Sequence, residues 1–401
     1  MPTVRLAFHR AKKILLTLAS IVIFIEGAFA IVSLQFIVNA VFYKDVIRRQ
    51  KYLDQSKKNF ILLLVTILRI VAPSQVRITT ENASIPKNSF VTDRRTGGIV
   101  SNMLRQSVII SNHQIYTDWV FLWWLAYTGG LAGNVFIMLK NSLERIPILG
   151  YGMRNYNFIF MNRKWEKDRV NLANRLAELD RNAKGVGYLA GKSPIGVATD
   201  GEAIWENSKS FERDDKQIHW PYALILFPEG TNLSAGTRAR NAEYAAKMNL
   251  PKLNNTILPR VTGLRNVLLG LKSSCEVVYD ATIGYSGVRQ NEYGQDIYRL
   301  GNIFLKGRAP RIVDIHLRAF RLDEIPIEDE KDFTEWLLKV WREKDELLDS
   351  YYATGAFDLD PAQNTTAMGW CKLTAFEMLS ILVFPIFTIF LIIWLMYKRL
   401  F

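Results

Sequence analysis

The sequence predicts an α/β domain held between an N-terminal and a C-terminal transmembrane helix. Short apolar, β-branched runs alternate with helical patterns through the middle of the chain, which is typical of an α/β sheet. Apolar blocks as long as the roughly 20 residues that span a bilayer lie near both ends. The chain has 401 residues, of which 49% are hydrophobic, so it can form one large domain with appendages, or two domains.

The first apolar block covers residues 14–42, with Glu26 as its one charge. It is about twice as long as the apolar region of a signal peptide, roughly 7–15 residues, so we expect a retained anchor. A buried helical hairpin is the alternative. A shorter run at residues 60–72 carries Arg69, and about residues 59–73 are predicted to be interfacial or re-entrant. Residues 1–74 are the predicted N-terminal membrane anchor.

Residues 75–323 are predicted to form the α/β domain. Strands are expected where β-branched and apolar residues cluster, at residues 75–79, 107–110, 135–138, 158–161, 222–227, 276–283 and 311–320. Helices are expected where apolar residues recur at helical spacing, at residues 120–127, 166–184, 237–248 and 262–272. Residues 81–101 and 191–217 are rich in turn-forming residues and are interpreted as insertions.

The C-terminal part is predicted to return the chain to the membrane. Residues 333–352 have the pattern of an amphipathic helix, and residues 324–370 are interpreted as an amphipathic helical linker. Residues 371–401 are predicted to form a C-terminal transmembrane helix, because Glu377 is the one charge within residues 373–397.

The formal net charge is +13, and basic residues flank both ends of the first apolar block. This distribution favours anionic lipid headgroups but gives no orientation by the positive-inside rule. Because the charges lie beside membrane segments, nucleic acid is not expected as a partner. Cys275 and Cys371 form no CxxC or Cys/His cluster, so neither a zinc site nor a disulfide framework is indicated.

The stretch ISNHQIYTDWVF, residues 110–121, places His113 five residues before Asp118. On one continuous helix this spacing corresponds to about 140° of rotation, so the two side chains would not share a face. They can meet if His113 lies in the loop before the helix and Asp118 in its first turns. The carboxylate would then orient the imidazole through Nδ1 and leave Nε2 as a base. A single His–Asp pair is more often structural, so other motifs have to support this interpretation.

The sequence FPEGT follows the strongest predicted strand and places Glu229, Gly230 and Thr231 at its end. Open α/β sheets bind ligands at the carboxyl ends of their strands. Taken alone, this motif is more often an ordinary turn at the end of a strand.

Two further motifs end in cations that suit a phosphate group. FIFMNR ends a predicted strand with Arg163, and ILPRVTG places Pro259 and Arg260 at a predicted strand-to-helix junction. Each arginine alone would more often form a surface salt bridge.

In this order and spacing, NHQIYTD, FIFMNR, FPEGT and ILPRVTG resemble the signature motifs of the glycerolipid acyltransferase superfamily. The resemblance covers about residues 108–285 and looks closest to the lysocardiolipin and lysophosphatidylinositol acyltransferase branch. It implies a mixed sheet flanked by helices. It also implies transfer of an acyl chain from acyl-CoA to a lysophospholipid hydroxyl. Lysophosphatidylinositol is the expected acceptor, and lysophosphatidic acid and lysocardiolipin are alternatives.

The resemblance also implies roles for the motif residues. His113 and Asp118 would be catalytic, and the substrate-binding set would be Arg163, Glu229, Gly230, Thr231, Pro259 and Arg260. Because a carboxylate does not bind phosphate directly, we expect Glu229 to orient Arg163 or Arg260, or to accept from an acceptor hydroxyl. Backbone amides at the helix start are expected to hold the developing oxyanion. No metal or cofactor is expected, and acyl-CoA is the co-substrate.

Other functions remain open at this point. Neither cysteine lies in residues 108–263, which argues against a cysteine nucleophile. A serine hydrolase would need a G-x-S-x-G elbow, and Gly284-Tyr-Ser-Gly287 has a different spacing. A CoA-independent transacylase and a non-catalytic lipid-binding protein are the remaining alternatives, and the intact motifs argue against the second. The expected location is the endoplasmic reticulum membrane, as a multi-pass protein, with the lipid droplet as an alternative.

Overall fold

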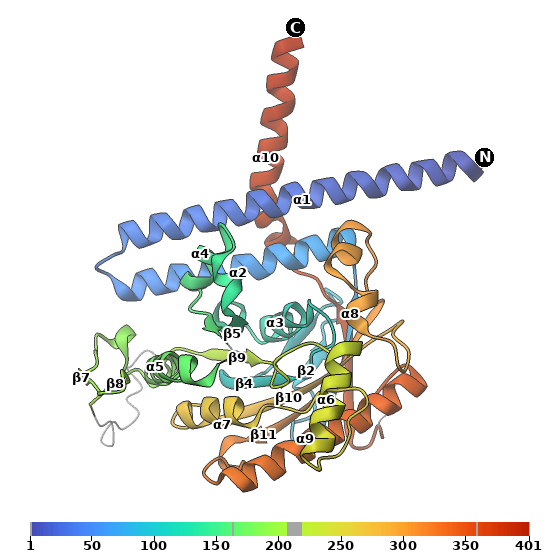
Figure 1. Cartoon of the computed structure of the whole chain (residues 1–401). Helices are drawn as coiled ribbons and strands as arrows, with labels where there is room; N and C mark the ends of the chain where they lie inside the picture. Colours follow the sequence, from blue (N-terminus) through green and yellow to red (C-terminus); the bar gives the residue numbers. More distant parts are fainter. Residues whose placement is uncertain (1, 163, 207–218, 358–359, 401) are drawn as a thin grey trace.

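The computed structural model describes residues 2–162, 164–206, 219–357 and 360–400. A mixed sheet lies at its centre (Figure 1). The sheet has eight strands in the order β12-β1-β11-β10-β4-β9-β5-β6. Its strands are β1 (Gln75–Glu81), β4 (Gln106–Ser111), β5 (Val135–Lys140), β6 (Ile159–Met161), β9 (Tyr222–Leu226), β10 (Val277–Tyr285), β11 (Ile312–Arg321) and β12 (Asn364–Trp370). Two small hairpins are formed by β2 (Phe90–Thr92) with β3 (Ile99–Ser101) and by β7 (Gly196–Val197) with β8 (Ala203–Ile204).

Helices cover both faces of this sheet (Figure 1). The α-helices of the described chain are α1 (Pro2–Val41), α2 (Val46–Val71), α3 (Asp118–Thr128), α4 (Leu149–Asn155), α5 (Trp165–Ala183), α6 (Ala235–Lys247), α7 (Val261–Gly270), α8 (Gly294–Ile297), α9 (Glu330–Thr354) and α10 (Ala375–Leu400), and α10 projects away from the sheet. The mixed sheet flanked by helices is therefore confirmed.

The alternation of side chains along β4 explains why the sheet has two cores. Ile109 joins the core with α2 and α3, whereas Val108 and Ile110 join the core with α5, α7 and α9. Successive residues of a strand point to opposite faces, so an uninterrupted apolar strand is buried on both sides.

Five neighbouring strands run in the same direction. β10 is parallel to β4, β4 to β9, β9 to β5, and β5 to β6. Their carboxyl ends therefore meet along one edge of the sheet, which is the edge where open α/β folds bind ligands. The segments that follow β4, β6 and β9 hold three of the four predicted motifs.

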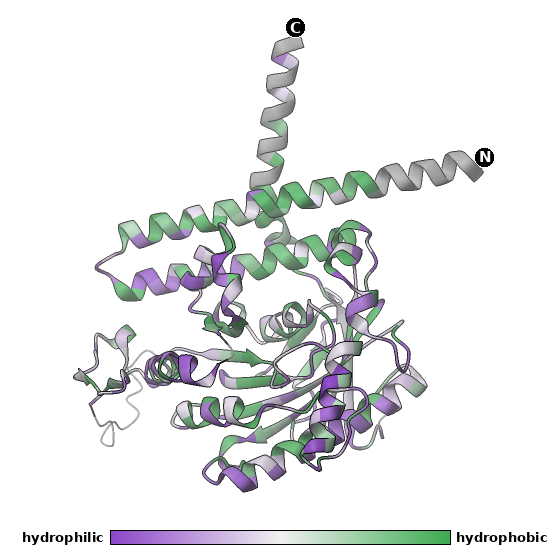
Figure 2. Ribbon diagram, viewed as in Figure 1, coloured by the Kyte–Doolittle hydropathy of each residue, from purple (hydrophilic) through white to green (hydrophobic). Residues whose placement is uncertain are grey.

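The N-terminal helices α1 and α2 form an antiparallel pair beside this sheet (Figure 1). Ile14–Val41 is long and apolar enough to cross a membrane, and among the described residues it is the one helix with these properties. The predicted short segment at residues 59–73 lies mostly in the second half of a longer helix, α2, and residues 60–68 are buried against the core. Figure 2 shows this apolar half of α2 and the largely apolar course of α1 from residue 14 onward.

The segment at residues 324–370 belongs to the α/β unit. The predicted helix is present within α9. It is not a linker, because its side chains Phe333, Leu337 and Trp341 pack in the core on one face of the sheet. β12 then pairs antiparallel with β1 along the whole strand. The sheet therefore extends beyond the boundary predicted at Asp323, and α10 leaves the body only after β12 (Figure 1).

Two local predictions also need correction. The turn-rich segment at residues 81–101 contains the hairpin of β2 and β3. The sequence predicts a strand that ends at Arg260, but residues 251–260 form neither a helix nor a strand. This segment is held by single backbone bonds instead: Leu258 N donates to the Asn241 side chain and Arg260 N to the carbonyl of Pro228.

Candidate active site

The chain leaves the sheet at His113. Just before it, the Asn112 side chain makes the two hydrogen bonds to β10 that a further backbone pair would otherwise make. Register pairing of β4 with β10 ends at Ser111. The Asn112 side chain then donates to the carbonyl of Ile283 at 3.0 Å and accepts from its N–H at 2.8 Å. This mimic of a strand residue fixes the point at which the loop begins.

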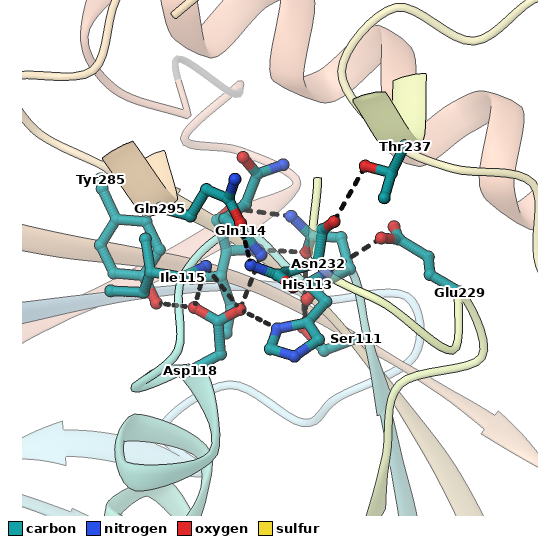
Figure 3. A network of polar contacts seen from close by, with 12 residues as sticks. Ser111, His113, Gln114, Ile115, Asp118, Glu229, Asn232, Thr237, Tyr285 and Gln295 are labelled. Carbon is teal, nitrogen blue, oxygen red and sulfur yellow. Dashed lines mark hydrogen bonds and ion pairs between the residues drawn. The ribbon is translucent and has the colours of Figure 1, made fainter. Parts of the chain in front are cut away.

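Asp118 is fully buried in the first turn of α3, and four groups donate hydrogen bonds to it. His113 Nδ1 lies 2.7 Å from Oδ2, and the backbone N–H groups of Gln114 and Ile115 donate to the same oxygen at 2.7 and 3.1 Å (Figure 3). The hydroxyl of Tyr285, at the end of β10, donates to Oδ1. The carboxylate therefore has a fixed position from which it orients the imidazole. His113 in the loop and Asp118 in the first turn of the helix therefore meet as predicted.

The His113 ring is held at an accessible position. Its side chain is 20% exposed, and the ring stacks on Phe227 with centroids 4.3 Å apart. Because an ionised carboxylate only accepts hydrogen bonds, contact with Asp118 places the proton on Nδ1. Within the described ranges no protein group bonds to Nε2, so its lone pair is available to an incoming hydroxyl.

Glu229 is buried behind the His113 loop, with 2% of its surface exposed. Its Oε2 accepts from the backbone N–H of His113 at 3.3 Å (Figure 3). Its Oε1 accepts from Trp341 Nε1 at 3.4 Å. Burial raises the pKa of the Glu229 carboxyl to about 8, although these hydrogen bonds and the nearby Lys344 ammonium act in the opposite direction. The side chain thus connects FPEGT to the loop that carries the histidine.

Gly230 allows Arg260 to approach the same loop. Gly230 has φ +70°, and a Cβ atom there would lie 2.8 Å from Arg260 Nε. Any other residue would therefore strain the backbone and displace the guanidinium. Arg260 is exposed, and no ion pair joins it to Glu229 among the described residues. The expectation that Glu229 orients Arg260 is not met in this geometry.

The other predicted substrate-binding residues lie at the same end of the sheet or outside the described part. Thr231 is half-buried after β9, and Pro259 is buried before α7. Arg163 lies outside the described residues. Its neighbours Asn162 and Lys164 both donate backbone N–H bonds to Asp168 in the first turn of α5.

Three backbone amides near the start of α3 are already engaged. Those of Gln114 and Ile115 donate to Asp118, and that of His113 donates to Glu229. The expectation that amides in this segment hold an oxyanion therefore does not apply to these three. They position the base and its partner instead.

Helix α9 supports the site from the opposite face of the sheet, and sequence reasoning missed its role. Lys344 is buried, lies 2.7 Å from Asp280 and donates to the carbonyl of Ala281 at 2.7 Å. Burial disfavours ionisation of Asp280, but the cations of Lys344 and Arg318 hold its pKa below the ordinary range. Charged residues of an amphipathic helix normally face solvent, so the sequence pattern did not single out this cluster.

Asp345 extends this support to the histidine loop. It accepts backbone N–H bonds from Asn254, Asn255 and Thr256, at 2.7 to 2.9 Å. The carbonyl of Asn255 in turn accepts from the Gln114 side chain at 2.8 Å. A chain of hydrogen bonds therefore runs from α9 to the residue beside His113.

Among the described residues, no group of three or more His, Cys, Asp or Glu side chains is placed to hold a metal ion.

Comparison with known proteins agrees with this geometry. Residues 94–278 match the family described as Acyltransferase, and residues 303–379 match the family described as Acyltransferase C-terminus. The 2-acyl-1-lysophosphatidylinositol acyltransferase of Saccharomyces cerevisiae is 52% identical over 390 residues, covering 97% of each chain. Lysocardiolipin acyltransferase 1 of Gallus gallus is 30% identical over 252 residues, covering 62% of this chain and 55% of that protein. Lysophosphatidylinositol acyltransferase 10 of Caenorhabditis elegans is 28% identical over 252 residues, covering 62% and 53%. The chain therefore belongs to the acyltransferase family.

Proposed function

We propose that this enzyme transfers a fatty acyl chain from acyl-CoA to the free hydroxyl of a lysophospholipid, with His113 and Asp118 as its catalytic pair. The observation that carries the proposal is the accessible Nε2 of His113, on a ring whose Nδ1 lies 2.7 Å from the buried carboxylate of Asp118. A base of this kind is what an alcohol needs in order to attack a thioester at neutral pH.

The reaction then requires no acyl-enzyme. His113 Nε2 takes the proton of the acceptor hydroxyl while the oxygen forms a bond to the thioester carbonyl carbon. The carbon–sulfur bond breaks, the CoA thiolate leaves, and the imidazolium returns its proton to the thiolate. Asp118 stabilises the imidazolium during this sequence, and its four hydrogen bonds prevent it from turning away.

Lysophosphatidylinositol is the acceptor that we propose. This choice is supported by the S. cerevisiae relative, a 2-acyl-1-lysophosphatidylinositol acyltransferase that is 52% identical over nearly the whole chain. Lysophosphatidic acid and lysocardiolipin are the alternative acceptors. We assign Arg260, and Arg163 beyond the described residues, to the phosphate of the acceptor. Gly230, Thr231 and Pro259 would shape that subsite, and Glu229 would act on it by fixing the loop that His113 and FPEGT share.

The enzyme is proposed to work at a bilayer surface, where its lipid substrates reside. Ile14–Val41 has 28 residues, and at about 1.5 Å per residue this helix exceeds the roughly 30 Å of a hydrocarbon core. We assign residues 1–74 as the N-terminal anchor and residues 371–401 as a second transmembrane helix, which makes the protein multi-pass. The proposed location is the endoplasmic reticulum membrane, with the lipid droplet as the alternative.

A panel of lysolipids tests this proposal. The purified full chain is incubated with radiolabelled acyl-CoAs of several lengths and with lysophosphatidylinositol, lysophosphatidic acid, lysocardiolipin or lysophosphatidylcholine. We expect labelled phosphatidylinositol to form fastest, with equimolar CoA release. Preference for another lysolipid would overturn the acceptor assignment. Acyl transfer from a diacyl phospholipid without acyl-CoA would instead identify a transacylase.

A further inference from the structure

A second polar site lies at the junction of α2 and the start of α10, away from the catalytic pair. A cavity of about 230 Å³ opens there, lined by Val65, Thr66, Arg69, Lys372, Leu373, Ala375 and Met378. Since a water molecule takes up about 30 Å³ in the liquid, the cavity has room for a compact polar group. It lies near the carboxyl end of α3, whereas Asp118 occupies the first turn of that helix.

Two cations meet at this cavity, and its lining contains no carboxylate. Arg69 lies over the ring of Trp370, with its guanidinium carbon 5.0 Å from the ring centroid. In the described part of the chain, neither Arg69 nor Lys372 has an ion-pair partner. The nearby acid, Glu377, is 3.0 Å from Lys58 and accepts from the hydroxyl of Tyr127 at 2.5 Å. The cavity is therefore electropositive.

A buried hydroxyl provides an independent indication of a ligand. Thr66 is 1% exposed and lines the cavity, and its Oγ1 has no hydrogen-bond partner among the described residues. An unsatisfied buried polar group is costly, so native structures rarely contain one without a function or a bound molecule. A ligand with acceptor oxygens would satisfy Thr66 and both cations together.

We propose that this cavity binds the phosphate group of an anionic membrane phospholipid, at a site separate from the active site. Phosphate oxygens accept hydrogen bonds from Thr66 Oγ1, Arg69 and Lys372, and charge-assisted bonds of this kind are strong. The remaining walls are apolar, formed by side chains such as Val65, Leu373 and Met378. Free inorganic phosphate has no apolar part to pack against these walls, whereas the glycerol and acyl part of a lipid does. The site adjoins α10, which we assign to the membrane.

Binding can be measured independently of turnover. The full chain is purified in a neutral detergent, and its thermal unfolding midpoint is followed while dioctanoyl phosphatidylglycerol, dioctanoyl phosphatidylcholine or inorganic phosphate is added. We expect phosphatidylglycerol to stabilise the wild type in a saturable way. Equal stabilisation by phosphatidylcholine would overturn the proposal, and equal stabilisation by inorganic phosphate at the same concentration would overturn its assignment to a lipid.

The variant R69Q/K372Q tests the location of the site. We expect its Kd for phosphatidylglycerol to rise by about tenfold or more, because two charge-assisted contacts are lost. Its turnover at saturating lysolipid should remain at the wild-type value. The matched control K331Q/R342Q removes the same charge from exposed positions on α9 and should bind like the wild type. Wild-type affinity in R69Q/K372Q would contradict the proposal.

Thr66→Val covers the case in which the double variant does not fold. Valine has nearly the shape of threonine, so the protein should fold and, without lipid, unfold no earlier than the wild type. Its affinity for phosphatidylglycerol should fall several-fold, and Thr66→Ser should restore it. Unchanged affinity in Thr66→Val would show that the hydroxyl has no part in binding, and would overturn the proposed phosphate site of Thr66, Arg69 and Lys372.

Discussion

Two histidine–carboxylate pairs lie among the described residues, and their surroundings differ. In the first pair, His113 Nδ1 is 2.7 Å from Asp118, which also accepts two backbone amides and a tyrosine hydroxyl. In the second, His316 Nε2 lies 3.3 Å from Glu81 at the end of β1, and neither ring nitrogen of His316 makes a hydrogen bond of good geometry in the described structure. Glu81 is only half-buried, and its contact with His316 lowers the pKa of its carboxyl.

The difference lies in access and in what holds the carboxylate. The His113 side chain is 20% exposed, whereas that of His316 is 1% exposed within β11. A substrate hydroxyl can therefore reach the first ring but not the second. A short His–carboxylate distance is thus insufficient for catalysis, because a base needs a fixed partner on one nitrogen and free access to the other.

Replacement of His113 by alanine should have the largest effect. We expect turnover to fall by about 10³-fold, within the usual range for loss of a general base. CoA release and product formation should fall together, and the circular dichroism spectrum should stay unchanged. Turnover above a tenth of the wild-type rate in a folded His113→Ala protein would show that this pair is no more catalytic than the second.

Glu229→Gln should have a smaller effect, visible mainly as a change in pH dependence. Burial raises the pKa of Glu229 from 4.5 to about 8, so between these values the folded protein binds more protons than the unfolded one. Stability should therefore decrease as pH rises through this window, by at most about 1.4 kcal/mol per pH unit for one proton.

Unfolding midpoints of both proteins between pH 6 and 8 measure this effect. The glutamine variant should show a flatter profile, since Lys344 and the other titrating groups are common to both proteins. Turnover should fall less than about tenfold, because glutamine can still accept from the His113 N–H. Parallel profiles would mean that Glu229 does not titrate in this window, and would contradict a pKa raised by burial.

His316→Gln should have the smallest effect on catalysis. We expect turnover within about twofold of the wild type and a change in unfolding free energy of about 1 kcal/mol, as is common for a buried substitution. Assays at equal protein concentration, with His113→Ala as the inactive reference, measure both quantities. Loss of turnover in a folded His316→Gln protein would remove the distinction between the two pairs.

Much of the sheet and the first pair could be predicted from local sequence. The apolar run of β4 ends at Ser111, and polar residues lie between it and α3. They mark the strand-to-helix loop that brings His113 and Asp118 together. The loop after β9 was equally clear, because a buried strand opens directly into FPEGT. In each case the relevant residues lie within a few positions of one another, so spacing alone carries the information.

The support from α9 and β12 could not be predicted in the same way. β12 has the sequence NTTAMGW, whose polar start and single buried alanine give no strong strand pattern, and it is fixed by pairing with a partner almost 300 residues away. Trp341, Lys344 and Asp345 lie on a helix that reads as amphipathic. Only the folded structure brings them to Glu229, Asp280 and the loop at residues 254–256.

A double-mutant cycle on His113 and Asp118 tests most directly whether the two act as one catalytic unit. Turnover is measured for the wild type, His113→Ala, Asp118→Asn and the double variant, with folding checked in each. Asp118→Asn alone should reduce turnover by about 10²-fold or more, because the imidazole loses its orienting charge. If Asp118 acts only through His113, the double variant should be no slower than His113→Ala. A double variant slowed by the product of the two single effects would contradict a shared role.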